Sequence, residues 1–203
     1  MFSYFHYIDT CNKYKENGYK FCNLGEKIAK NGKNLYMVHD IDLHIENAER
    51  LSLIENKNNI NSTYFVRLSA LTYNIFNESY KLKIKKIIDN GHSIGLHFER
   101  TFKNRTLKND ILFCKEILSE IIEYDVKYFN IHEPVRTGID ISKLMTSQNR
   151  CYNSEFFKNV KYLSDSGGRW REGCFSNHIN KHKDLLVLTH PFYWYENKPQ
   201  ENY

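Results

Sequence analysis

Two kinds of segment, which differ in the spacing of their apolar residues, alternate along the chain. Short runs rich in β-branched and aromatic residues predict strands at residues 34–40, 62–68, 92–98, 126–132, 160–164 and 185–190. Longer segments with apolar residues three or four positions apart predict helices at residues 8–18, 44–57, 79–89 and 106–122, with Ser79 as N-cap of the third. A further short helix is expected near residues 140–146, within an irregular polar stretch at 135–159.

Strands that alternate with helices predict an α/β fold with a mostly parallel sheet, either open or closed into a barrel. The length of 203 residues suits one domain over residues 1–203. In parallel sheets of this kind, functional side chains gather beyond the carboxyl ends of the strands. We therefore expect catalytic or ligand-binding residues at these strand ends.

Composition and charge narrow the class of protein. A hydrophobic content of 41% and an aromatic content of 15% are sufficient for a packed core. The net charge of +5 is spread along the chain without a run of like charge, which argues against binding to a nucleic-acid polymer. The same positive excess favours an anionic small-molecule substrate.

The cysteines and the apolar runs indicate where the protein works. The cysteines are odd in number and form no CxxC pair, which argues against a disulfide framework and a thiolate zinc cluster; they are Cys11, Cys22, Cys114, Cys151 and Cys174. The N-terminus has no signal-peptide pattern, and no apolar run is long enough to span a bilayer. We therefore expect a cytoplasmic protein without a membrane span.

Ionisable side chains stand at the ends of five predicted strands. Core packing alone would favour apolar residues at these positions. The residues concerned are His39, Asp40 and Asp42 at the end of the first strand, His97 at the end of the third, His132 at the end of the fourth, Asp165 after the fifth and His190 at the end of the sixth. We therefore predict a functional site at this edge of the sheet.

The two carboxylates of the segment "HDID" suggest a metal site. Asp40 and Asp42 point to the same face if the strand continues that far, and His39 points to the opposite face. Two carboxylates on one face repel each other, and a divalent cation relieves the repulsion. One can then be a ligand while the other is a general base, and His97 with another imidazole would complete a nitrogen–oxygen site suited to Zn²⁺. The alternative interpretation makes Asp42 the N-cap of the helix at 44–57.

Several of these segments resemble motifs of the polysaccharide deacetylase superfamily, the carbohydrate esterases with NodB homology. "HDID" is similar to the first motif, "NGHSIGLHFE" to the second and "LLVLTHPFYW" to the last, so the resemblance extends over residues 35–194. It implies a distorted parallel (β/α) barrel with fewer than eight strands. With "SDSGGRWREG", the chain most resembles a divergent branch found among surface-polysaccharide biosynthesis proteins.

The resemblance also implies roles for single residues. It makes Asp40 the general base, His190 the general acid, and Asp42 and His97 metal ligands. The second metal histidine of the superfamily would stand four residues after His97, where this chain has Thr101. The third ligand must then come from elsewhere: we take His132, with Glu99, His39 and His44 left open.

The remaining candidates have a functional and a structural interpretation. Asp165 can orient a catalytic side chain, Arg169 can hold a carboxylate or phosphate, and Trp170 and Trp194 can line a sugar pocket. The structural interpretation is a tight turn with Trp170 in the core and with Trp194 covering the end of the barrel. Among the other histidines, His92 is predicted to be structural, and His178 and His182 are predicted to be exposed.

These observations predict a metal-dependent N-deacetylase of an amino-sugar intermediate in capsule-type or O-antigen-type polysaccharide biosynthesis. The cofactor would be a divalent metal, with zinc the first choice, and the substrate a small-molecule, nucleotide-linked or lipid-linked sugar. Two different functions stay open: the same fold running another sugar modification, such as amide formation or acyl transfer, and a non-catalytic carbohydrate-binding relic.

Overall fold

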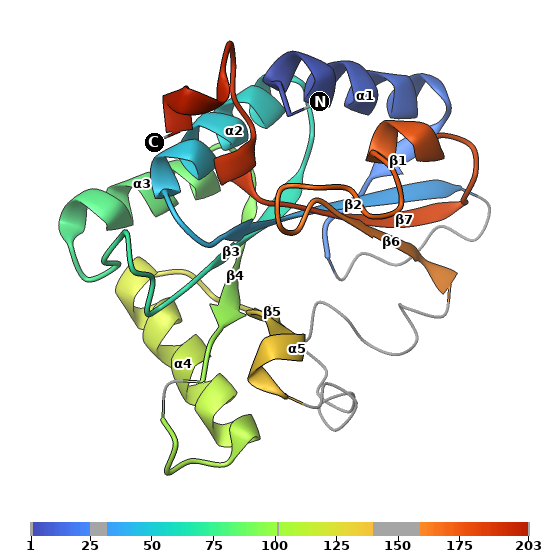
Figure 1. Ribbon diagram of the computed structural model, residues 1–203. Coiled ribbons are helices and arrows are strands. Elements are labelled where there is room, and N and C mark those ends of the chain that lie inside the picture. The colour runs from blue at the N-terminus through green and yellow to red at the C-terminus, as the bar shows by residue number, and fades with distance from the viewer. Residues whose placement is uncertain (1, 25–31, 101, 140–158, 203) are drawn as a thin grey trace.

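The computed structural model describes residues 2–24, 32–100, 102–139 and 159–202. These residues form one sheet of seven parallel strands, in which β1 pairs with β2 beside the path β5-β4-β3-β2-β7-β6 (Figure 1). The strands are β1 (Tyr19–Phe21), β2 (Lys33–Ile41), β3 (Ser62–Val66), β4 (Ser93–Phe98), β5 (Phe129–Ile131), β6 (Lys161–Ser164) and β7 (Asp184–Thr189). The sheet is curved, and because no pairing joins β5 to β6 within the described ranges, it forms an open half-barrel. The predicted distorted barrel with fewer than eight strands is confirmed.

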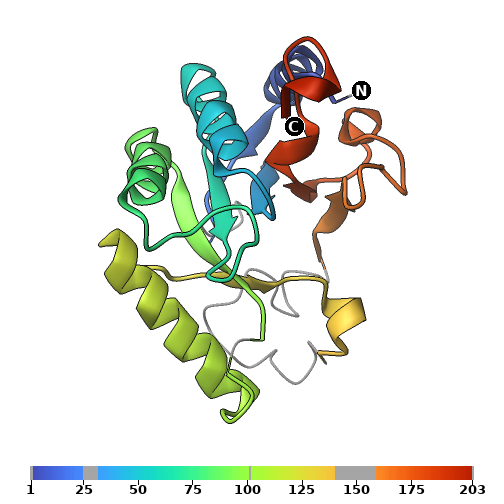
Figure 2. The same ribbon diagram turned by 60° about the vertical axis from the view of Figure 1, so that its left-hand side comes forward.

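Helices cover the outer face of the curved sheet. They are α1 (Tyr4–Glu16), α2 (Ile45–Lys57), α3 (Glu78–Asp89) and α4 (Leu107–Ile122). The short α5 (Pro134–Thr137) follows β5 and buries none of its residues, and the 3-10 turns are η2 (Phe175–His178), η3 (Pro191–Tyr193) and η4 (Pro199–Asn202). Figure 2 shows α2, α3 and α4 side by side along this face. Within the described part of the chain, no helix is long and apolar enough to cross a membrane.

The helix starts differ from the predicted ones because other side chains cap them. The first helix begins at Tyr4, four residues early, since the Ser3 hydroxyl accepts the His6 backbone N–H. The cap of α3 is Asn77, whose side chain accepts the backbone N–H of the predicted cap, Ser79. The predicted helix at residues 140–146 lies outside the described residues.

Two further predictions on local structure are resolved. The residue before α2 is His44, which makes no side-chain cap, so Asp42 does not serve as the N-cap of this helix. Within the described ranges, Cys11, Cys22, Cys114 and Cys174 are free and buried; Cys151 lies outside these ranges.

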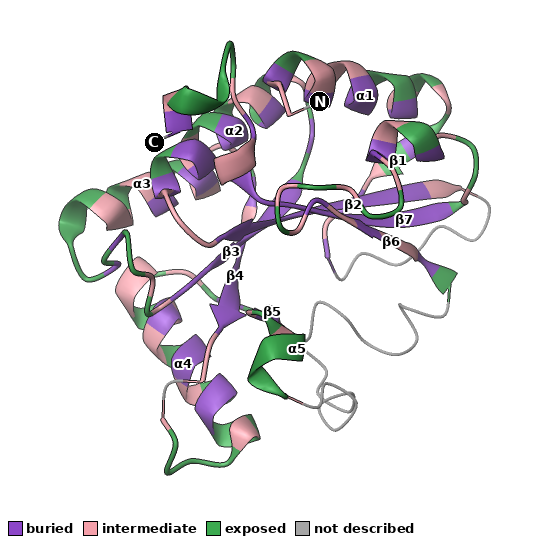
Figure 3. Ribbon diagram, viewed as in Figure 1, coloured by how far each residue is buried: buried purple, intermediate pink, exposed green. Residues whose placement is uncertain are grey.

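Side chains alternate between the two faces of the sheet along β2, which is buried along nearly its whole length (Figure 3). Leu35, Met37 and Ile41 pack beneath the helices, whereas Tyr36 and Val38 pack on the inner face. The same alternation continues to the end of the strand and gives each polar residue there a fixed direction. It sends His39 outward and Asp40 inward.

A buried polar network surrounds Glu55 beneath α2. The fully buried carboxylate accepts hydrogen bonds from the hydroxyls of Tyr7, Ser62 and Tyr64. The His39 ring joins it, with Nε2 3.0 Å from Glu55 Oε1 and Nδ1 2.7 Å from the Thr189 hydroxyl. His39 is therefore not the third metal ligand, because its ring is committed on the opposite face of the sheet.

Replacing Glu55 by glutamine is expected to destabilise the fold in a pH-dependent way. Burial alone would raise the pKa of Glu55, but the charge and hydrogen bonds of His39 and its other neighbours lower it to about 2. A carboxyl with a depressed folded pKa contributes its full stability above its unfolded pKa and loses it as the pH falls. The difference in free energy of unfolding between wild type and Glu55→Gln should thus shrink by about 2 kcal/mol from pH 5 to pH 3.

Urea unfolding of both proteins across this pH range, in a chelating buffer, measures the difference. Glu116→Gln, at an exposed position of α4, controls for the loss of one carboxylate. A difference between wild type and Glu55→Gln that stays constant from pH 5 to pH 3 would contradict the role assigned to this network.

Candidate metal centre

Polar side chains from the ends of β2, β4 and β5 converge on the inner face of the sheet. Asp42 follows the last residue of β2, His97 points inward from β4, and His132 follows β5. The backbone N–H of His132 donates to the Phe98 carbonyl at 2.8 Å, which keeps the end of β5 in register with β4. The outward neighbours Phe98 and Ile131 anchor the same segments in the core beneath the helices.

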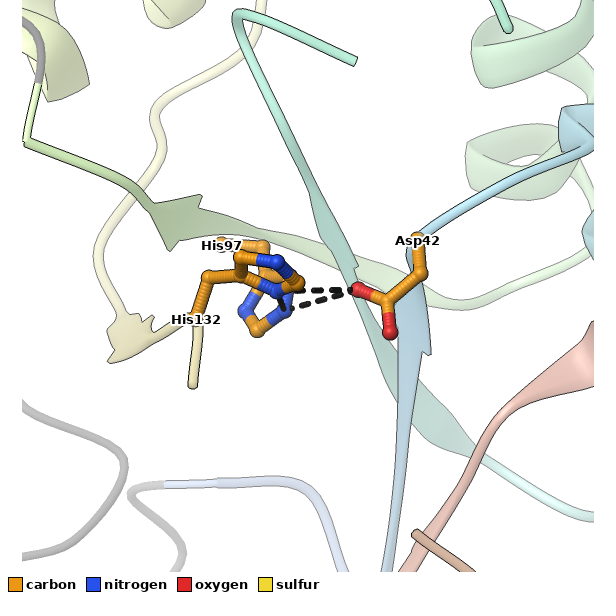
Figure 4. Close-up of side chains that lie close together, drawn as sticks. All are labelled: Asp42, His97 and His132. Atoms are coloured by element: carbon orange, nitrogen blue, oxygen red, sulfur yellow. Dashed lines mark hydrogen bonds and ion pairs between the residues drawn. The ribbon is translucent and has the colours of Figure 1, made fainter. Parts of the chain in front are cut away.

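Three possible ligand atoms lie close together at this point. Asp42 Oδ1 is 3.0 Å from His97 Nε2 and 3.3 Å from His132 Nδ1, and the two imidazole nitrogens are 3.0 Å apart (Figure 4). Ligands about 2.1 Å from one tetrahedral zinc ion lie about 3.4 Å from each other. The observed separations are close to this value, so the three side chains fit a metal ion with little movement.

One oxygen of the Asp42 carboxylate faces the two imidazoles without a hydrogen bond of good geometry to any described residue. This atom, Oδ1, is buried. Burial would raise the pKa of this carboxyl, but the adjacent His132 and His97 lower it below the ordinary aspartate value. A buried, ionised oxygen facing two imidazoles is the arrangement that a divalent metal stabilises.

Asn130 fixes the orientation of the His97 ring. Its amide N–H donates to Asp40 Oδ1 at 2.6 Å, so its carbonyl oxygen faces His97 Nδ1 at 2.5 Å. This contact assigns the proton of the neutral ring to Nδ1 and leaves the Nε2 lone pair directed at Asp42. Sequence reasoning missed Asn130, although it lies two residues before His132 and alternation places both on one face.

The predicted base and acid candidates lie beside the three ligand atoms. Asp40 Oδ2 is 3.7 Å from His97 Nε2, and His190 Nε2 is 3.6 Å from Asp42 Oδ2. Burial alone would lower the pKa of His190, but the hydrogen bond and charge of Asp165, helped by Asp40 and Asp42, raise it to about 9. A carboxylate and a protonated imidazole thus flank the candidate metal position.

Asp165 holds His190 from behind. Its Oδ1 is 2.7 Å from His190 Nδ1, and it also accepts the His190 backbone N–H at 3.1 Å. The indole N–H of Trp194 donates to the other oxygen of Asp165 at 2.9 Å. Because Trp194 is fully buried, it offers no ring face to a sugar, and its predicted place in the substrate pocket is wrong.

A cavity of about 650 Å³ opens over these side chains. Besides the candidate ligands, Asp40 and His190, its wall includes Tyr162, Ser166, Arg171 and Tyr193. Arg169 is exposed and does not line it, so the arginine of the turn "SDSGGRWREG" that reaches the cavity is Arg171. Trp170 stacks on Phe175 with ring centroids 5.5 Å apart and lines a smaller adjoining cavity of about 150 Å³.

Glu99 and His44, two further candidates for the third ligand, are engaged elsewhere. Glu99 accepts from Arg67 Nη2 at 2.6 Å, and the His44 ring lies 5.7 Å from that of Phe192. The geometry therefore favours His132 as the third ligand. Thr101, at the position of the superfamily's second metal histidine, lies outside the described residues.

Three further histidines lie away from the candidate metal centre. His92 is buried between the Ser62 hydroxyl and the Ser52 carbonyl, as predicted. His178 is buried rather than exposed as predicted, because η2 turns its Nε2 toward the Glu172 carbonyl at 3.0 Å. The His182 ring stacks on it at 5.6 Å and is partly exposed.

The chain matches no protein-family model and no curated protein. Among solved structures, it is similar to a family 4 carbohydrate esterase from Bacillus anthracis, with a TM-score of 0.48 and 17% identity over 89% of this chain and 76% of that one. It is also similar to the Streptococcus pyogenes deacetylase PplD in complex with acetate, with a TM-score of 0.48 and 14% identity over 97% and 83% of the two chains.

A further similar structure is a CE4 family pseudoenzyme from Bacillus anthracis, with a TM-score of 0.47 and 14% identity over 80% of this chain and 56% of that one. These three similar structures are thus a carbohydrate esterase, a deacetylase and a CE4 family pseudoenzyme. None of these three names refers to surface-polysaccharide biosynthesis, so that narrower resemblance stays a prediction.

Proposed function

We propose that the protein is a metal-dependent deacylase that hydrolyses the N-acyl amide of an amino sugar. The observation that carries the proposal is the convergence of Asp42, His97 and His132, whose ligand atoms all lie within 4.8 Å of one another. A carboxylate and an imidazole, Asp40 and His190, lie beside this cluster in the same cavity. Together they provide the groups that amide hydrolysis requires.

The donor set fits a first-row divalent metal. Two imidazole nitrogens and one carboxylate oxygen, with a position left for substrate or water, are typical of catalytic zinc sites. Asp42, His97 and His132 would hold this metal, which when bound supplies Lewis acidity toward the amide carbonyl oxygen. Asn130 keeps the Nε2 lone pair of His97 available for it.

Asp40 and His190 have complementary roles in proton transfer. Because Asn130 donates to Asp40 Oδ1, the second oxygen of Asp40 is the one that accepts a proton from the attacking water. His190 presents Nε2 to the cavity while Asp165 holds its Nδ1. It donates the Nε2 proton to the leaving amine nitrogen, and Asp165 stabilises the ring in the required orientation.

We extend the proposal in three respects on the strength of the motif resemblance. The metal would be zinc, the substrate would be an intermediate of surface-polysaccharide synthesis, and the protein would act in the cytoplasm. Zinc is also supported by the nitrogen-rich donor set. The other two rest on the segments "SDSGGRWREG" and "LLVLTHPFYW".

The test is to incubate the zinc-loaded protein with a panel of N-acetylated amino sugars and to follow their masses. The proposal expects loss of the acetyl mass and release of acetate, both strongly reduced with Asp40→Asn. A gain in sugar mass in the presence of an acyl or amine donor would instead identify a transferase. No change with any sugar and donor would favour a non-catalytic binding protein.

Replacing Asn130 by alanine is expected to weaken zinc binding. Loss of its carbonyl frees the His97 ring to adopt the other tautomer, and loss of such a hydrogen-bond partner typically costs roughly 10- to 100-fold in metal affinity. Competition with a chromogenic chelator measures the affinity, with Asn109→Ala, exposed on α4, as control. Equal zinc affinity in the two variants would show that Asn130 does not orient the ligand.

A further inference from the structure

Arg171 brings an uncompensated positive charge to the wall of the cavity. The side chain is exposed and has no carboxylate within ion-pair distance among the residues that the structure describes. The neighbouring Glu172 is paired with Lys161, so it does not neutralise this charge. Arg136 also lines the cavity, but its Nη1 lies 2.8 Å from Glu133 Oε2.

The surroundings of Arg171 continue from the candidate metal centre into the smaller cavity. Tyr162, Ser166 and Arg171 line both cavities, and Trp170 forms part of the smaller one. Gly167 leaves the wall open at this point, since a Cβ placed there would meet no atom within 4 Å. The combined space can take a substrate larger than the amide that reacts at the metal.

The charges of the cavity give a bound substrate a direction. Asp40 and Asp42 line the part of the cavity next to the metal ligands and would repel an anion from the reacting position unless the metal held it. Arg171 offers an anion a guanidinium, which pairs with phosphate and carboxylate oxygens through two parallel hydrogen bonds. The net charge of +5 favours the approach of such a ligand.

We infer that Arg171 binds an oxyanion carried by the substrate, which makes the substrate an anionic amino sugar. This inference rests on the proposed function for the sugar, whereas the oxyanion subsite itself rests on Arg171 and the shared wall. A phosphate on the sugar and a carboxylate on its ring have the same chemistry toward a guanidinium. The anion thereby holds the sugar with its acylamino group toward the metal ligands.

Equilibrium binding to the zinc-loaded protein tests the subsite with three probes: N-acetylglucosamine, N-acetylglucosamine 1-phosphate and N-acetylglucosaminuronic acid. The proteins are the wild type, Arg171→Ala and the matched control Arg169→Ala, which removes the same charge two residues away. We expect at least one anionic sugar to bind wild type and Arg169→Ala more tightly than the neutral sugar, by roughly 10- to 100-fold, as for a charged hydrogen bond. Arg171→Ala should lose this preference.

The anionic sugar whose tighter binding is lost in Arg171→Ala identifies the anion as phosphate or carboxylate. Equal affinities of Arg171→Ala and Arg169→Ala for all three sugars would overturn the inference. So would an Arg171→Ala variant that binds the neutral sugar as much more weakly as it binds the anionic ones.

Because the binding measurement does not need turnover, the oxyanion subsite and the proposed function can fail separately. If anionic sugars bind in an Arg171-dependent way but the protein deacylates none of the sugars, the oxyanion subsite stands and the proposed function fails. If the sugars are deacylated with the same kcat/KM by Arg171→Ala and Arg169→Ala, the proposed function stands and the subsite fails.

Discussion

Replacing His97 by alanine is expected to abolish stoichiometric zinc binding and deacylation together. His97 is almost completely buried between Asp42, Asn130 and His132, so its replacement removes one of the three ligand atoms and leaves a gap in the cluster. Loss of a ligand should cost more than the roughly 10- to 100-fold in metal affinity that loss of its hydrogen-bond partner costs. Elemental analysis after dialysis against zinc, followed by the acetate-release assay, measures both effects.

The matched control for this experiment is His182→Ala. His182 is a partly exposed histidine that precedes β7, so it lies near the strand end opposite the candidate metal centre. This variant should keep the zinc and the activity of the wild type. A His97→Ala protein that retains one zinc per chain and deacylates at the wild-type rate would exclude His97 from the centre.

Replacing Asp40 by asparagine is expected to lower turnover by roughly 10²- to 10⁴-fold, the usual contribution of a positioned general base. The substitution preserves the shape of the side chain and the oxygen that accepts from Asn130, but removes the charge that takes the proton. Because Asp42, His97 and His132 are unchanged, the zinc content should remain near that of the wild type.

The contrast with Asp42→Asn separates the two carboxylates. Asp42 supplies the ligand oxygen, so its amide variant should lose zinc as well as activity. Steady-state kinetics and elemental analysis on both variants form the test. If Asp40→Asn lost its zinc, or if it turned over substrate as fast as the wild type, Asp40 would not be the base.

Periodicity was sufficient to predict most of the fold. Runs such as residues 34–40 and 185–190 are apolar on both faces, as expected for strands covered by helices on one side and by core residues on the other. The element boundaries were harder, because a cap depends on a single hydrogen bond. Ser79 satisfies the general preference for a cap, but Asn77 makes the contact.

The part of the candidate site that lies at the ends of strands could be predicted from the sequence. Asp40, Asp42, His97, His132 and His190 stand at those ends, and a parallel sheet brings them to one edge. From the sequence we take His132 as the third ligand but leave Glu99, His39 and His44 open, since spacing along the chain does not tell which rings meet.

Residues that act through contacts distant in sequence were beyond prediction. Asn130 shares a face with His132, but its role depends on Asp40, which lies 90 residues earlier. The sequence around Trp194 suggests a residue that stacks on a sugar, but its indole N–H donates a hydrogen bond to Asp165. Glu55 lies on a helix of mixed polarity, and nothing in that pattern shows that its carboxylate is buried.

The measurement that tests the metal centre most directly is anomalous diffraction at the zinc absorption edge from crystals of the zinc-loaded protein. We expect one peak per chain, about 2.0–2.2 Å from His97 Nε2, His132 Nδ1 and Asp42 Oδ1. Crystals that contain zinc but show no anomalous peak among these three atoms would contradict the proposed metal-dependent deacylase.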